Sequence, residues 1–198
     1  MNARVVLASQ SASRKAILTG AGIAFEAASP GVDEDALKVG LLARGATPRE
    51  IAGALAEAKA LALPRAPDEL VIGSDQTLEF EGRLYDKAAS LEEARERLVM
   101  LRGKTHRLEG AVVVARGGEP IWRDAATSTL VMRDFSDAFL DAYLSDEGPA
   151  LLSSVGCYRL EGPGAQLFSR IEGDYFAILG LPLLNLLDLL RREGAIRA

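Results

Sequence analysis

The sequence of 198 residues has very little of the chemistry on which several protein classes depend. Its single cysteine, Cys157, and single histidine, His106, exclude both an internal disulfide framework and a Cys/His zinc cluster. We interpret Cys157 as a small core residue and expect His106 to satisfy a hydrogen bond at a strand end. The most apolar window, residues 176–190, is too short and too polar to span a bilayer. We recognise no signal peptide and therefore expect a cytoplasmic protein that does not interact with membranes.

Basic runs and glycine-rich phosphate loops are also missing. The formal net charge is -5, and no segment is rich in lysine and arginine, which argues against binding to a nucleic acid polymer. The absence of a Walker pattern argues against a P-loop nucleotidase. The composition, 48% hydrophobic and 26% charged, is instead typical of a globular protein with a substantial core.

Helix and strand patterns alternate along the whole chain, with no repeat or linker between them. Strands are expected at residues 4–8, 70–74, 78–80, 83–85, 107–115, 121–132 and 167–171. Helices are expected to begin at Ser11 or Ser13 and run to about residue 19, and at residues 47–62, 90–101, 136–144 and 182–192. Two of them are opened by capping boxes at 47–50 and 90–93. This mixture predicts an α/β fold with a mixed sheet.

Two short polar blocks each follow an apolar strand. Ser9, Ser11 and Arg14 stand where a helix begins, and Asp75 follows the second strand. Ligands of α/β proteins bind beyond the carboxyl ends of the strands. Hydroxyls, backbone N–H groups and a guanidinium suit a phosphate, although a serine at this place also serves as a helix cap. Asp75 suits a role as ligand of a divalent cation or as a general base, although aspartate is also common in turns. Together the blocks predict a site for a nucleoside phosphate and its metal.

Other charged residues allow both a structural and a functional interpretation. The acidic run Asp33, Glu34 and Asp35 suits a solvated helix start, or one of its carboxylates reaches the metal, and spacing does not choose among the three. Isolated lysines are usually solvated. Lys59 is unusual because it stands beside Ala58, which we place on the inward stripe of its helix.

Four separated motifs resemble the signatures of the Maf (septum-formation-inhibitor-like) nucleotide pyrophosphatases. They occur in the family's order, and the resemblance extends from about residue 4 to residue 192. The motifs lie at residues 7–14, 71–76, 101–106 and 170–183. The resemblance implies a single domain over residues 1–198, with a long mixed sheet flanked by helices and two lobes around a cleft, akin to the inosine-triphosphate pyrophosphatases.

The resemblance also implies an activity. Members hydrolyse nucleoside triphosphates to the monophosphate and pyrophosphate, which removes non-standard or surplus nucleotides, and they use a divalent metal such as Mg, Mn or Co. A homodimer is implied as well. Carried over residue by residue, Asp75 would accept the proton of the attacking water and contact the metal, and Glu34 would be a metal ligand. The implied phosphate-binding residues are Ser9, Ser11, Arg14, Lys59 and Lys87.

Some positions depart from the usual family pattern, and others indicate which branch of the family the chain resembles. Asp86-Lys87-Ala88 replaces the common Gly-Lys-Pro. The block at residues 73–76, together with Glu161, resembles the branch that acts on modified guanosine triphosphate. Gln76 and Glu161 would then contact the base, because a carboxylate accepts hydrogen bonds from guanine-type N–H groups and cannot pair with the carbonyls of uracil. The alternatives are a catalytically weak nucleotide-binding regulator of cell division and a plain interaction module.

Overall fold

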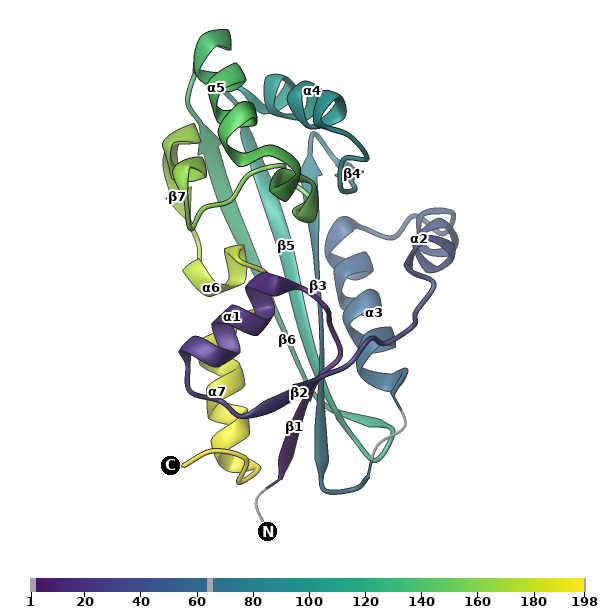
Figure 1. The fold of residues 1–198 in the computed structure, drawn as a ribbon. Helices are drawn as coiled ribbons and strands as arrows, with labels where there is room; N and C mark the ends of the chain where they lie inside the picture. Colours follow the sequence, from purple (N-terminus) through teal and green to yellow (C-terminus); the bar gives the residue numbers. More distant parts are fainter. Residues whose placement is uncertain (1–2, 64–65, 198) are drawn as a thin grey trace. The chain divides into compact units, whose positions relative to one another are not determined.

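The computed structural model describes residues 3–63 and 66–197, which form an α/β structure with a mixed sheet (Figure 1). Six strands of these residues follow the order β2-β1-β3-β5-β6-β7, and a seventh, β4, pairs with β3. The strands are β1 (Arg4–Leu7), β2 (Phe25–Ala27), β3 (Glu69–Phe80), β4 (Arg83–Tyr85), β5 (Thr105–Arg116), β6 (Glu119–Met132) and β7 (Phe168–Glu172). The predicted fold class is thereby confirmed.

The helices include both predicted and unpredicted elements. The α-helices are α1 (Ala12–Gly20), α2 (Glu34–Leu42), α3 (Pro48–Leu61), α4 (Leu91–Leu101), α5 (Asp137–Glu147), α6 (Tyr175–Ile178) and α7 (Leu183–Arg192). Two 3₁₀ helices are η1 (Gly148–Ser153) and η2 (Pro163–Leu167). The patterns missed β2, α2, α6 and both 3₁₀ helices, which are short or lack buried residues at helical spacing. None of the described helices is long and apolar enough to cross a membrane.

The described residues form two compact units. The first comprises the residues up to 76, residues 109–126 and the residues from 174 on. The second comprises residues 77–108 and 127–173. In the second unit, α4 packs against α5 and η1.

Strand β1 separates two cores in the first unit, because successive side chains of a strand point to opposite faces. Val5 and Leu7 pack with α1 and α7, whereas Val6 and Ala8 pack with α3. Figure 1 shows α1 and α7 on one side of these strands and α3 on the other. Strand β1 pairs in parallel with both β2 and β3, so the loop after β1 and the loop after β2 leave the sheet at the same edge.

Helix α3 lies unusually close to β3. Its small residues Ala56 and Ala60 face the strand at Gly73. A Cβ atom at Gly73 would lie 2.1 Å from the Ala56 carbonyl oxygen and 2.5 Å from the Ala60 nitrogen. Only glycine therefore permits this approach, which brings the side chain of Lys59 to the strand.

The predicted helix starts are confirmed with one exception. Ser11, Ser90 and Ser136 each cap a helix by accepting a backbone N–H, and Thr47 forms the expected capping box with Glu50. The capping box expected at residues 90–93 is incomplete, because the Glu93 side chain accepts from the backbone N–H of Ala89. These caps are local features, so the sequence alone specifies them.

Two predictions about burial and strand length are wrong. Ala58 is only half-buried, because the buried stripe of its helix passes through Lys59 and Ala60. The second strand does not end at residue 74 but continues through Asp75 to Phe80, where it pairs with β4. Asp75 nevertheless lies beyond the end of the neighbouring β1, whose last residue pairs with Ile72.

Candidate functional site

Lys59 holds two carboxylates in the first unit. It continues the buried stripe of α3 formed by Ile51 and Leu55, which recurs every four residues. Its Nζ atom lies 2.6 Å from Oδ1 of Asp75 on β3 and 2.9 Å from Oε1 of Glu34, the first residue of α2. The side chains of Lys59 and Asp75 are 7% and 10% exposed, whereas that of Glu34 is 41% exposed. This ion triad therefore reaches from the interior to the surface.

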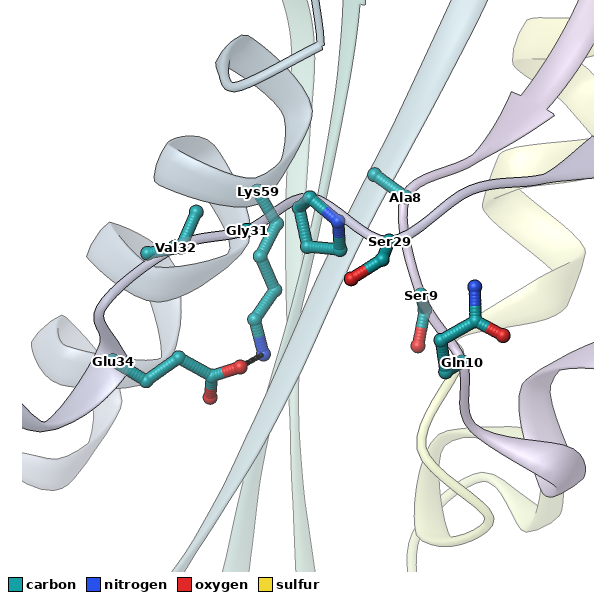
Figure 2. Close-up of a pocket in the computed structure, with 9 residues that line it drawn as sticks. Ala8, Ser9, Gln10, Ser29, Gly31, Val32, Glu34 and Lys59 are labelled. Carbon is teal, nitrogen blue, oxygen red and sulfur yellow. Dashed lines mark ion pairs between the residues drawn. The ribbon is translucent and has the colours of Figure 1, made fainter.

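A cavity of about 200 Å³ opens beside the triad. It is lined by Ala8, Ser9, Gln10, Ser29, Pro30, Gly31, Val32, Glu34 and Lys59. Figure 2 shows the loop after β1 on one wall, α2 and α3 on the other, and the hydroxyls of Ser9 and Ser29 turned toward the space between them. The structure thus brings together Ser9, Glu34 and Lys59, three of the residues that the family resemblance implies for the site.

Ser29 is a candidate that the sequence reasoning missed. Leu7 pairs with Ala27 across β1 and β2, so Ser9 and Ser29 each follow a strand end by two residues. The signal that would have revealed it is the parallel pairing of β1 with β2. The short strand β2 gave no recognisable pattern for that pairing.

The loop after β1 is tied together by hydrogen bonds. The hydroxyl of Ser9 accepts from Nη1 of Arg14 at 3.2 Å and from the backbone N–H of Ser11 at 3.2 Å. The Ser11 hydroxyl caps α1 by accepting the Arg14 N–H. Burial lowers the pKa of Arg14, and the negative charges of Asp75 and Glu34 act in the opposite direction. Arg14 therefore lies within the electrostatic field of both acidic residues.

The carbonyl of Gly180 joins α1 to β3. It accepts a hydrogen bond from Nε of Arg14 at 2.8 Å and another from the hydroxyl of Ser74 at 2.9 Å. Ser74 also donates to the carbonyl of Ala111 at 2.8 Å. Ser74 and Gly180 thus hold the two predicted blocks of the site in one arrangement, a role that no local pattern indicates.

The charged side chains at this site balance one another. Arg14 and Lys59 are cations, Glu34 and Asp75 are anions, and the formal charges of the four side chains sum to zero. The described part of the chain contains no group of three or more His, Cys, Asp or Glu side chains that could hold a metal. The carboxylates of the triad, Glu34 and Asp75, could offer oxygen ligands to a cation at this place.

The sequence matches one protein family over nearly its whole length. The model of the family described as Maf-like protein matches residues 4–193. This chain belongs to the Maf-like family. The resemblance seen in the four motifs is thereby confirmed.

Maf-like proteins with curated names are similar to this chain over nearly their full length. A nucleoside triphosphate pyrophosphatase of Caulobacter vibrioides is 62% identical over 192 residues, which cover 97% of this chain and 96% of the relative. A 7-methyl-GTP pyrophosphatase of Rhizobium meliloti is 50% identical over 199 residues and 100% of both chains. A second 7-methyl-GTP pyrophosphatase, from Brucella abortus, is 47% identical over 99% of both.

The remaining candidates of this Maf-like chain are not among the residues that line the cavity. Gln76 donates from its amide nitrogen to the carbonyls of Ala177 at 2.8 Å and Ile178 at 3.1 Å, so its Nε2 holds α6. Lys87 and Glu161 belong to the second unit. Lys87 is exposed, and Glu161 lies 3.5 Å from Nε of Arg159.

Proposed function

We propose that this Maf-like protein hydrolyses nucleoside triphosphates to the monophosphate and pyrophosphate, and that the cavity beside Lys59 receives the phosphates. The observation that carries the proposal is the ion triad of Lys59, Asp75 and Glu34, of which Lys59 and Glu34 line one wall of a cavity whose other wall is the Ser9 loop. The names of the relatives support the same reaction.

Each side chain then has a distinct role. Asp75 accepts the proton of the attacking water, whose oxygen forms a bond to phosphorus while the anhydride bond between the α- and β-phosphates breaks and pyrophosphate leaves. Lys59 holds Oδ1 of Asp75 and adds positive charge near the phosphates. Ser9 and Arg14 bind phosphate oxygens through hydroxyl and guanidinium groups, and the backbone at Ser11 opens α1 toward them.

A divalent cation fits the donor chemistry of this site. Glu34 and Asp75 offer the carboxylate oxygens that Mg²⁺ and Mn²⁺ prefer, and Mg²⁺ is commonly held by one or two carboxylates together with substrate phosphates and water. We propose these two residues as its protein ligands. When bound, the cation would supply positive charge against the phosphate oxygens.

The proposed substrate carries a guanine-type base. Two of the similar relatives are named for 7-methyl-GTP, which supports this choice. We propose base contacts for Glu161 and Gln76, and a phosphate contact for Lys87, following the family resemblance. We also propose a cytoplasmic homodimer, which light scattering after gel filtration would test together with fractionation of cells.

An assay of released pyrophosphate tests the proposed reaction. Purified protein is incubated with Mg²⁺ or Mn²⁺ and a panel of ordinary and modified triphosphates that includes 7-methyl-GTP. We expect equal amounts of monophosphate and pyrophosphate. Orthophosphate without pyrophosphate would contradict the bond assignment, and tight binding without turnover would favour the nucleotide-binding regulator instead.

A further inference from the structure

Lys87 is exposed, yet the backbone on both sides of it is held by buried groups of the second unit. Its neighbour Ala88 is 5% exposed. The backbone N–H of Ala89 donates to Oε2 of Glu93 at 2.8 Å. The backbone beside Lys87 is therefore fixed, whereas its side chain keeps its rotamer freedom.

Arg97 holds the side of this segment that precedes Lys87. Its Nη1 donates to the carbonyl of Asp86 at 2.8 Å and to the carbonyl of Val155 at 2.9 Å, and its guanidinium lies 4.9 Å from the centre of the Tyr85 ring. Nη2 lies 3.5 Å from Oε1 of Glu93. Arg97 is 8% exposed, so this charge is buried among partners that satisfy it.

Cys157 holds the side that follows Lys87. Its thiol is completely buried and accepts a hydrogen bond from the backbone N–H of Ala88. Burial raises the pKa of this thiol, and the nearby charge of Arg97 and the Ala88 N–H act against that rise. A proline at position 88 would have no N–H to donate. The Ala88 N–H therefore joins the backbone next to Lys87 to Cys157.

We infer that Arg97 is a positioning residue for Lys87, with Cys157 and Glu93 as its supports. This inference rests on the proposed function, in which Lys87 binds a phosphate. Arg97 fixes the backbone just before Lys87, so the ammonium starts from a defined place and less conformational entropy is lost when phosphate binds. Lysine cannot replace this arginine, because it lacks the planar guanidinium that spans two carbonyls and stacks on Tyr85.

A double-mutant cycle on the full-length protein tests the inference. We expect Arg97→Lys to lower kcat/KM for the triphosphate about tenfold, and Lys87→Met to lower it by about 10–100-fold, the range of a hydrogen bond to a charged group. If Arg97 acts through Lys87, Arg97→Lys has no further effect when added to Lys87→Met. Arg95→Lys, a half-buried position on the same helix whose ion pair with Asp141 a lysine can keep, is the control and leaves kcat/KM unchanged.

Amide hydrogen exchange gives a readout that does not depend on activity. We expect the amides of Ala88 and Ala89 to exchange at least tenfold faster in Arg97→Lys and in Cys157→Ala, and at the wild-type rate in Lys87→Met. Should Arg97→Lys fail to fold, Cys157→Ala takes its place in the cycle. The inference is wrong if Arg97→Lys lowers kcat/KM equally in the wild type and in Lys87→Met, or if the exchange of the Ala88 and Ala89 amides is unchanged. Neither result would bear on the proposed hydrolysis. If the wild type releases no pyrophosphate, the proposed function fails and exchange alone decides the positioning.

Discussion

Nζ of Lys59 lies 2.6 Å from Oδ1 of Asp75, and both side chains are buried to nine-tenths or more. The two residues are 16 positions apart and belong to different elements, α3 and β3. Their meeting depends on Gly73, which lets the helix approach the strand. A buried pair of this kind is costly to break, because the remaining charge would lose its partner.

Lys59→Met is expected to destabilise the protein by about 3–5 kcal/mol, since it leaves the buried carboxylate of Asp75 unpaired. Urea unfolding followed by circular dichroism measures the change. Lys15→Met removes an ammonium whose hydrogen bond to Oε1 of Gln10 is exposed to solvent, and it should cost less than about 1 kcal/mol. Similar losses in both variants would argue against an energetically important buried pair.

Asp75→Asn is expected to lower kcat by about 10²–10⁴-fold, the usual contribution of a general base. The variant keeps the shape of the side chain and an oxygen that accepts from Lys59. Asp188→Asn, at an exposed ion pair on α7, serves as the control and should keep full activity. A loss below about tenfold for Asp75→Asn would rule out the base role.

Gly180→Ala is expected to lower kcat/KM about tenfold or more. Gly180 has a φ of +103°, which alanine rarely adopts, and relief of this strain would turn the carbonyl that accepts from Arg14 and Ser74. Gly194→Ala is the matched control, because Gly194 also has a positive φ, +70°, but its Cβ would meet open space. Steady-state kinetics measures kcat/KM for both variants. A larger loss in Gly180→Ala would show that the Gly180 carbonyl positions Arg14, whereas equal losses would show that backbone strain alone lowers the activity.

Stability should fall as the pH drops below neutrality because of His106. Burial lowers the pKa of this histidine to about 4, and Nε2 lies 2.8 Å from the hydroxyl of Tyr158. In the unfolded chain the pKa of this histidine is near 6.5, so the unfolded chain binds more protons than the folded chain between about pH 6.5 and 4. The free energy of unfolding therefore has the full contribution of His106 above about pH 6.5 and loses it as the pH falls toward 4.

Unfolding at pH 7 and pH 5.5 measures this effect. A single site with these pKa values costs about 1 kcal/mol over the interval. His106→Gln removes the only histidine of the chain and should remove that part of the pH dependence. Identical pH profiles for the wild type and the variant would show that His106 is not held in its neutral form.

Much of the fold follows from local patterns. The serine caps, the capping box at Thr47 and the hairpin at Glu81-Gly82 are each specified by a few adjacent residues. In the hairpin, both turn residues have positive φ, 51° and 76°, as a two-residue turn between antiparallel strands requires. Short elements without such signals, such as β2 and α2, escaped prediction.

The candidate site was only partly predictable for the same reason. Spacing did not choose among Asp33, Glu34 and Asp35, whereas the fold brings Glu34 to Lys59 and uses Asp33 as the cap of α2. Nothing adjacent in sequence distinguishes Ser29 as a residue that lines the cavity.

From the sequence alone came the α/β class, the helix starts, the family and the residue types suited to phosphate and a cation, because these depend on neighbouring residues and on motif order. Tertiary structure alone decided that Asp75 lies within a strand, that Lys59 faces two carboxylates and that Arg97 braces the backbone at Lys87. Such relationships join residues that are distant along the chain. They are set by strand register and helix packing, which no short stretch of sequence specifies.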